Sequence, residues 1–325
     1  MVSRLRARLE VTPRQYRLIA NITLVALSLI VLTGVAVRLT QSGLGCANWP
    51  KCGSTLLPPL SYHAVIEFGN RVVGALVGVV TAAAVVFAFT RRPYRRDLAR
   101  LSLTLPVGVI VQAVLGGLTV KGKLAPGWVI AHFAVSMVIL IGAFALAWRA
   151  AHEPGSRPRS TDRLGVWAVR ALLPLGALTI SVGTIATAAG PHSGGSAGQH
   201  ILRLHFRGAD TLTWVVHRHA VVATLFGIAV IATWLLYRHR GASEKEMEPL
   251  TVLGILLAAQ GLVGAVQYEL KLPADMVWVH VGLATATWIT VLWTVASAGR
   301  LVPRTSTVPV AEAGAPAGDR ALVAR

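Results

Sequence analysis

Long runs of apolar residues alternate along the chain with short segments rich in Arg, Gly and Pro. Eight runs are roughly 19 to 24 residues long, and about 20 helical residues cross the hydrocarbon core of a bilayer. They cover 18–37, 72–90, 101–120, 128–148, 171–189, 214–237, 250–268 and 276–298. A helix satisfies its own backbone hydrogen bonds, as lipid requires, so the pattern predicts eight transmembrane helices. The fifth run is the weakest, because hydroxyl residues interrupt it.

The composition agrees with a membrane protein. Hydrophobic residues make up 54% of the 325 residues and charged residues 14%, with a mean hydropathy of +0.62. A soluble domain has about a quarter charged residues, and a disordered chain has far fewer large apolar ones. The net charge of +18 raises the question of nucleic acid. The apolar runs leave little soluble surface for such a patch, and we expect no nucleic-acid partner.

The basic residues predict the orientation of the chain. More than two thirds of the 31 Lys and Arg residues lie in the N-terminal segment, the even-numbered connections and the C-terminal tail. The positive-inside rule therefore places both termini in the cytoplasm, where anionic membrane lipid attracts these segments. We expect a basic N-terminus at 1–17, a cytoplasmic linker at 151–170 and a disordered tail at 300–325.

The sequence repeats itself at an offset of 147 to 148 residues. The matches are Gln112 and Gly116 with Gln260 and Gly264, His132 with His280, Asn70-Arg71 with His217-Arg218, and Thr40–Gly43 with Thr187–Gly190. Two tandem four-helix bundles, 18–150 and 171–299, follow from this repeat. Because four is even, both copies share one orientation, which predicts a pseudo-twofold axis along the membrane normal and disfavours an inverted-repeat transporter.

A few ionisable residues interrupt the apolar runs near the predicted outer face, and such residues are candidates for function. His217 and His280 lie on the second and fourth helices of their copy, and Asn70 and His132 are their counterparts. Two facing histidines in a four-helix bundle suit axial ligation of a haem iron. Zinc is disfavoured because a closed site needs four ligands. Hydrogen-bonded interfacial histidines are the alternative, and His219, which has no counterpart, is predicted to point to a different helix face.

The remaining charged residues in this layer differ between the copies. Arg71 and Arg218 are positioned either to pair with carboxylates such as haem propionates or to extend to the interface. Glu67 lies on the helix face of Asn70, and Trp214 stands at the corresponding position in the second copy. This asymmetry suggests that one copy serves storage or electron transfer and the other serves chemistry, with structural pairing to Arg71 as the alternative.

The two cysteines of the chain, Cys46 and Cys52, lie in the first predicted outer loop, GLGCANWPKCG. An environment outside the membrane permits a disulfide, and the short loop with Pro50 brings the two residues within reach. A structural or redox-active disulfide is the favoured interpretation. Free thiols and a two-cysteine metal site are the alternatives.

Six segments together resemble the haem A synthase family. They are GVAVRLTQSGLGCANWPKC at 34–52, IEFGNRVVG at 66–74, AHFAVS at 131–136, AAGPHSG at 188–194, VVHRHAV at 215–221 and VHVGLAT at 279–285. The similarity runs over about residues 20–295. It implies a plasma-membrane enzyme that oxidises the C8 methyl group of haem O to a formyl group by successive hydroxylations. It also implies a haem b cofactor in the C-terminal bundle and substrate haem in the N-terminal one.

The resemblance assigns roles to individual residues. His217 and His280 match the cofactor-haem ligands, with Arg218 beside them. His132 matches a ligand of the substrate haem, near Arg71. Glu67 matches the catalytic carboxylate, and Cys46 with Cys52 match the loop cysteine pair.

Asn70 departs from the family pattern Glu-x-x-His-Arg. An amide oxygen is a poor iron ligand, so the substrate iron either has His132 as its one protein ligand or takes His63 as a substitute.

The expected partners are haem O, the haem O synthase that makes it, and an electron acceptor that the sequence does not identify; a homo-oligomer is left open. The main alternative function is a di-haem b-type cytochrome that exchanges electrons with quinone. The asymmetry at Asn70 and Glu67 counts against it, because such a cytochrome needs similar ligands in both copies.

Overall fold

A computed structural model describes residues 9–46, 48–54, 57–156 and 159–302. The first eight residues lie outside this part, and so does the predicted disordered tail, 300–325, except for its first three residues. The described residues form eight long helices: α2 (Pro13–Leu39), α3 (Tyr62–Thr90), α4 (Arg96–Lys121), α5 (Pro126–Ala151), α6 (Arg163–Ala189), α7 (Thr211–His239), α8 (Glu244–Glu269) and α9 (Ala274–Ser297). Each is long and apolar enough to cross a membrane. The prediction of an all-α polytopic membrane protein is confirmed.

Polar residues in front of the apolar runs begin several helices. Thr12 and Gln15 form a capping box at α2, and Ser61 accepts a hydrogen bond from the backbone of Ala64 at 3.4 Å at the start of α3. Because of the Ser61 cap, α3 begins ten residues before its apolar run. The polar segment 62–71 is therefore helical, which places its side chains on a defined surface.

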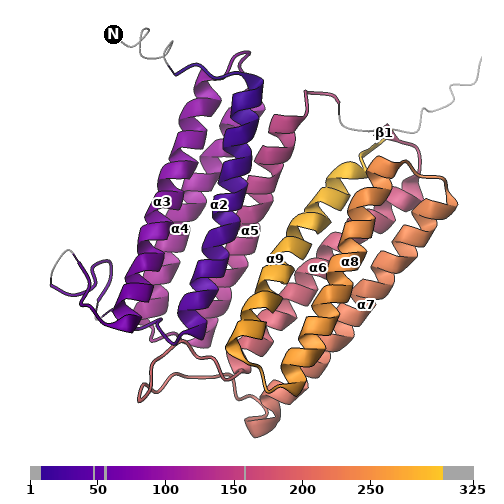
Figure 1. The fold of residues 1–325 in the computed structure, drawn as a ribbon. Helices are drawn as coiled ribbons and strands as arrows, with labels where there is room; N and C mark the ends of the chain where they lie inside the picture. Colours follow the sequence, from indigo (N-terminus) through magenta and orange to yellow (C-terminus); the bar gives the residue numbers. More distant parts are fainter. Residues whose placement is uncertain (1–8, 47, 55–56, 157–158, 303–325) are drawn as a thin grey trace, which may run out of the picture.

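The helices pack as two groups of four (Figure 1). Within each group the helices contact one another in chain order, and the first also contacts the last. Between the groups, α2 contacts α9, α5 contacts α9, and α5 contacts α6. If α2–α5 are exchanged with α6–α9 in order, the contact of α2 with α9 becomes the contact of α6 with α5, and the contact of α5 with α9 is unchanged. This is the pattern that a twofold relation requires. The direction of the axis relative to a membrane stays a prediction.

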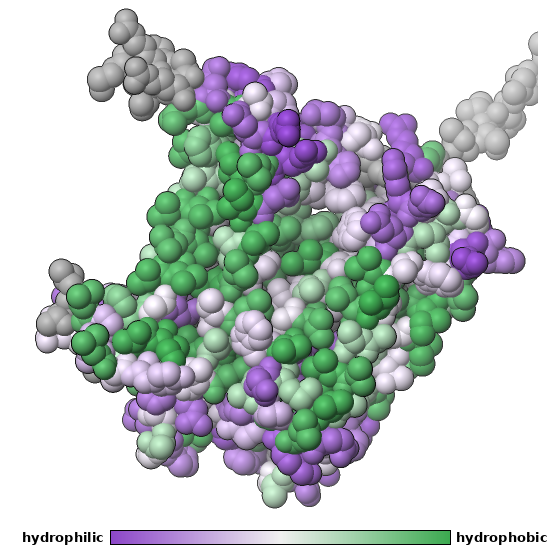
Figure 2. All heavy atoms as spheres, in the orientation of Figure 1, coloured by the Kyte–Doolittle hydropathy of each residue, from purple (hydrophilic) through white to green (hydrophobic). Residues whose placement is uncertain are grey.

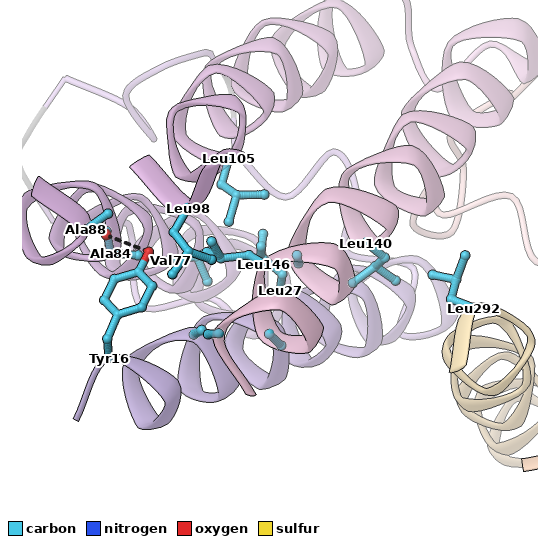
Figure 3. Close-up of a cluster of buried hydrophobic side chains, with 14 of the residues drawn as sticks. Tyr16, Leu27, Val77, Ala84, Ala88, Leu98, Leu105, Leu140, Leu146 and Leu292 are labelled. Carbon is cyan, nitrogen blue, oxygen red and sulfur yellow. Dashed lines mark hydrogen bonds between the residues drawn. The ribbon is translucent and has the colours of Figure 1, made fainter. Parts of the chain in front are cut away.

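The hydrophobic core of the first helix group extends to α9 of the second group. Tyr16, Leu98 and Leu146 are fully buried in the first group, and the Tyr16 hydroxyl donates to the carbonyl of Ala84 at 3.3 Å. Figure 3 shows Leu292 of α9 beside this cluster, although it belongs to the second group. The Trp288 indole, also on α9, donates to the Met137 carbonyl on α5 at 3.0 Å. Helix α9 therefore packs into both halves.

The two ends of the molecule differ in their connections (Figure 1). The start of α2, the linker and the short parallel pair β1 (Arg159–Ser160) and β2 (Arg300–Leu301) lie at one end. The other end, called the loop end here, carries the α2–α3, α4–α5, α6–α7 and α8–α9 connections and the short helix η1 (Gly208–Asp210). Figure 2 shows a mainly apolar band between polar ends, which fits a protein that crosses the membrane several times.

The repeat extends to a backbone feature that the sequence search missed. The Lys-Leu pair of the α4–α5 turn, Lys123 and Leu124, has φ of 49° and 57°. The equivalent pair after α8, Lys271 and Leu272, has φ of 64° and 63°, at the same offset of 148. Non-glycine residues rarely adopt positive φ. The shared conformation supports two copies of one helical unit.

Candidate functional site

Glu67 is a buried carboxylate at the loop end of α3, with 5% of its surface exposed. Its Oε2 accepts a hydrogen bond from the backbone N–H of Cys46 at 2.7 Å, and its Oε1 accepts one from the guanidinium of Arg71, one helical turn further on. Buried charges require such partners. The carboxylate is thus held by the α2–α3 connection, through the Cys46 backbone, and by the next turn of α3, through Arg71.

The loop between the two cysteines is closed by a disulfide, as favoured from the sequence. We call residues 46–52 the disulfide loop. The Nη1 of Arg71 donates to three of its carbonyls, those of Asn48 at 3.1 Å, Pro50 at 2.9 Å and Lys51 at 2.9 Å. Arg71 therefore directs its donors to this loop and to Glu67, which is the pairing given as the alternative from the sequence, and its contact with a haem propionate stays a prediction.

Through Trp49 the disulfide loop contacts α4 as well as α3. A Cβ atom added at Gly117 of α4 would lie 2.9 to 3.0 Å from atoms of the Trp49 ring, closer than side chains normally approach. Glycine at this position therefore lets the indole rest against the helix. The neighbouring Gly116 faces the His132 ring, with its added Cβ 3.6 Å from Cε1. The contact of Trp49 was not predicted from the sequence, where its signal is the Gly116-Gly117 pair on α4.

Asn70 and His63 also have partners near α2. The side-chain oxygen of Asn70 lies 2.8 Å from the Thr33 hydroxyl on α2. The Nδ1 of His63 lies 3.0 Å from the hydroxyl of Ser42, just after that helix. Asn70, at the ligand position of the family pattern, and His63, its suggested substitute, thus each have a hydrogen-bond partner in the chain.

His132 on α5 and His280 on α9 have matching surroundings. In each copy the Gln side chain of the preceding helix donates to the histidine's backbone carbonyl at 3.0 Å, from Gln112 and Gln260 respectively. In each copy the histidine ring faces the glycine that lies one turn after this Gln. A Cβ added at Gly264 would lie 3.1 Å from the His280 Cε1. Within the described part of the chain, Nδ1 of both rings is buried without a hydrogen-bond partner.

His217 lies on a more exposed surface of α7. Its Nδ1 donates to the carbonyl of Thr213 at 2.7 Å, and its ring centroid lies 6.4 Å from that of Tyr268 on α8. A hollow of about 370 Å³ is formed here by Arg207, Asp210, Thr213, Trp214, His217 and Arg218. The Trp214 ring has the guanidinium of Arg218 at 5.1 Å and that of Arg207 at 5.7 Å. The hollow combines cationic, aromatic and imidazole groups.

His219 is the ring that lies beside His280, with centroids 6.3 Å apart. Gly183 of α6 makes room for it, since a Cβ there would lie 2.9 Å from its Cε1. The repeat in the sequence predicts a pair of His217 and His280, with a lesser role for His219. The structure places His219 next to His280, and His217 against Tyr268.

These residues fit an iron held by a macrocycle. The Nδ1 atoms of His132 and His280 are buried and have no hydrogen-bond partner among the described residues, and the adjoining glycines let the two rings pack against the neighbouring helices. The hydrogen bond from His217 Nδ1 leaves Nε2 free, which is the arrangement common for a metal-ligating histidine. The class of protein defined by fold and site is a polytopic helical membrane protein with histidines suited to haem at one end of its two helix groups.

Comparison with known proteins identifies the family. A family model described as COX15-CtaA, cytochrome oxidase assembly protein, matches residues 17–65 and 61–194, more than half of the chain. The chain therefore belongs to the COX15-CtaA family.

Individual relatives match shorter or longer parts. A protein named Heme A synthase from Symbiobacterium thermophilum is 38% identical over 131 residues, 40% of this chain and 42% of the relative. A Heme A synthase from Bacillus licheniformis is 29% identical over 118 residues, 36% of this chain and 39% of the relative. A Protoheme IX farnesyltransferase from Thermus thermophilus is 29% identical over 283 residues, 83% of this chain and 46% of the relative. The chain thus spans about two fifths of the length of the two haem A synthases.

Proposed function

We propose that this protein is a haem A synthase, which oxidises the C8 methyl group of haem O to a formyl group by successive hydroxylations. The observation that carries the proposal is the buried Glu67, held by Cys46 and Arg71 in the half that also contains His132. Trp214 occupies the corresponding position of the other half. Family membership and the named haem A synthase relatives support this function.

The two halves take different roles in this proposal. The N-terminal bundle, 18–150, binds the substrate haem through His132 and carries out the chemistry. The C-terminal bundle, 171–299, binds a haem b through His217 and His280, with Arg218 at a propionate. The matched surroundings of His132 and His280 support two sites of common origin.

A bound haem supplies the redox chemistry. The protein binds the haem, orients it and excludes bulk water from the site. Glu67 is the proposed proton acceptor or water-positioning group beside the methyl carbon. A carboxylate has about four acceptor positions on its two oxygens, so the bonds to Cys46 and Arg71 leave capacity for a proton or a water. The disulfide loop, anchored by Arg71 and by Trp49 on Gly117, covers this end of the bundle.

A haem b held by His217 and His280 would supply an electron-accepting group on the other side of the interface between the two bundles. Helix α9, which carries His280, contacts α2 there through the Trp278 indole, which donates to the Leu32 carbonyl at 3.0 Å. The asymmetry at Glu67 and Asn70 favours this role over a di-haem cytochrome that serves quinone alone.

The protein is proposed to lie in the plasma membrane with both termini in the cytoplasm and both haem sites near the outer face. The haem O synthase is the proposed partner that delivers substrate. A relative named Protoheme IX farnesyltransferase, which matches 83% of this chain with 46% of its own length, supports a link to farnesyl transfer onto haem.

The test of the activity is expression of the chain together with a source of haem O, followed by extraction and separation of the haems. We expect haem A or its hydroxylated intermediate. The Glu67→Gln variant should retain bound haem and stop turnover. A folded, haem-loaded wild-type protein that forms neither product would refute the proposal.

The cofactor ligands are tested by the absorption spectrum of the purified protein. His217→Ala or His280→Ala should abolish the low-spin spectrum of haem b. Because His219 lies beside His280, His219→Ala is the matched comparison and should leave that spectrum in place. Loss of the spectrum in His219→Ala with its retention in His217→Ala would reassign the second ligand.

A further inference from the structure

Polar side chains at the loop end of α3 all have partners in the chain itself. Asn70 is hydrogen-bonded to Thr33, and His63 to Ser42. The carboxylate of Glu67 receives hydrogen bonds from the Cys46 amide and from Arg71. At residue 70, the position that matches His217, this surface presents an amide in place of the imidazole that would be a strong iron ligand.

Helix α5 on the other side of the bundle offers such a ligand. The His132 Nδ1 is buried and has no hydrogen-bond partner among the described residues, and the ring rests on Gly116. Neutral imidazole is a common axial ligand of haem iron, whereas an amide is not among the usual ones. The N-terminal half therefore provides one strong ligand.

The C-terminal half differs at the matching position. His217 replaces Asn70, and the bond from its Nδ1 to Thr213 leaves Nε2 free to bind a metal. A second imidazole on α7, that of His219, lies beside His280. This half can thus supply two imidazoles to one iron. In the N-terminal half the other imidazole, that of His63 on α3, lies seven residues before Asn70, about 10 Å away along the helix axis, and is therefore not at the matching position.

We propose that the N-terminal site gives the substrate haem iron a single protein ligand, His132, and leaves the opposite axial position open, with Asn70 beside it. This inference rests on the proposed function, since it concerns the same substrate site. An open position lets the substrate iron take a small external ligand. The C-terminal iron, held between two imidazoles, does not. One half is thereby open for chemistry, and the other is closed and suited to electron transfer.

Carbon monoxide is the probe, because it binds ferrous haem that has an open axial position. The full-length protein is purified with haem b and haem O bound, reduced, and titrated with carbon monoxide while its absorption spectrum is recorded. We expect the haem O fraction to bind the gas and the haem b fraction to keep its low-spin spectrum. A haem O fraction that is low-spin and unreactive in the wild type would overturn the inference.

Asn70→His is the decisive variant. It should make the haem O fraction low-spin and unreactive to carbon monoxide at unchanged haem content, because a second imidazole fills the open position. The matched control is Thr33→Val, which removes the hydroxyl bonded to Asn70 without adding a ligand and should keep carbon monoxide binding. Persistent binding in a haem-loaded Asn70→His protein would show that residue 70 is remote from the iron.

Two further variants cover the alternatives. His132→Ala should remove the haem O spectrum that responds to carbon monoxide. His63→Ala should change nothing. Gain of carbon monoxide binding in His63→Ala, from an unreactive wild type, would show that His63 is the second ligand. The carbon monoxide titration needs no turnover, so it tests the open axial position separately from the proposed activity. An unreactive haem O fraction in a protein that still forms haem A would overturn only this inference, whereas carbon monoxide binding in a protein that forms no haem A would overturn only the proposed function.

Discussion

Arg71 joins the disulfide loop to the buried carboxylate, so its removal perturbs the centre of the proposed site. Its side chain is 17% exposed and that of Glu67 is 6% exposed. Arg71→Met keeps an apolar stem of similar length. It removes the donors to the carbonyls of Asn48, Pro50 and Lys51, and it leaves Glu67 without its cationic partner.

The expected magnitude follows from the burial of this pair. Removing one member of a buried ion pair costs about 3 to 5 kcal/mol, because the other charge is left uncompensated. We take the lower end, about 3 kcal/mol, since water reaches part of Arg71 and offsets some of the loss. At about 1.4 kcal/mol per factor of ten, the open state of the disulfide loop should become about 100-fold more populated.

Trypsin cleavage after Lys51 measures this opening, because the residue lies within the disulfide loop and its carbonyl is an Arg71 acceptor. When opening is fast relative to cleavage, the cleavage rate follows the population of the open state. We expect a rise of about two orders of magnitude in Arg71→Met. Cleavage after Lys245, at the opposite end of the molecule, should not change.

The double variant Glu67→Gln/Arg71→Met separates the buried charge from the lost hydrogen bonds. It should be cleaved more slowly than Arg71→Met alone, because no unpaired carboxylate remains. Two results would refute the inference that Arg71 holds the disulfide loop closed over a buried charge. One is a cleavage rate in Arg71→Met within about threefold of the wild type, and the other is a double variant that is cleaved as fast as Arg71→Met.

Two other predictions concern the second half of the molecule. Gly264→Val should displace the His280 ring, which would lie 3.1 Å from the new Cβ, and should lower the haem b content of the purified protein. The control is Gly261→Val, whose new side chain faces open space and should leave the haem b content unchanged. Equal loss of haem b in both variants would contradict the contact between Gly264 and His280. Burial raises the pKa of Asp162, but hydrogen bonds from the start of α6 and from Arg240 outweigh this and lower it overall. The stabilisation from Asp162 is therefore present above its unfolded-state pKa and lost as pH falls through the lower folded pKa. Asp162→Ala should reduce the free energy of unfolding by about 1 kcal/mol near neutral pH, with the difference shrinking in acid, and a pH-independent difference in thermal unfolding would count against this reading.

Several features of the fold were accessible from the residue pattern. All eight apolar runs lie on long helices, including the hydroxyl-containing fifth run, which is part of α6 (Arg163–Ala189). The repeat was visible in the spacing of Gln112, Gly116 and His132, and these residues have the same contacts as their counterparts. Both features depend on local composition and spacing, which the sequence contains directly.

The contacts of the disulfide loop were not accessible in this way. The cysteine spacing indicated a disulfide, but nothing in it showed that Arg71 would bind three loop carbonyls or that Trp49 would rest on Gly117. Backbone carbonyls carry no sequence signal, and a glycine has many reasons to occur in a membrane helix. Such contacts exist only once α3, α4 and the loop are assembled.

The sequence by itself predicted the number of helices and the set of polar residues at one end of the helices, and its internal repeat indicated two copies of a four-helix unit. Only the tertiary structure decided which of these residues face one another, as in the pairing of His280 with His219 and of His217 with Tyr268. The physical reason is that a membrane helix is apolar towards lipid as well as towards its neighbours, so hydrophobicity does not fix its rotation about its own axis. For α7 that rotation is set by packing against α6 and α8, with Gly183 making room for one imidazole.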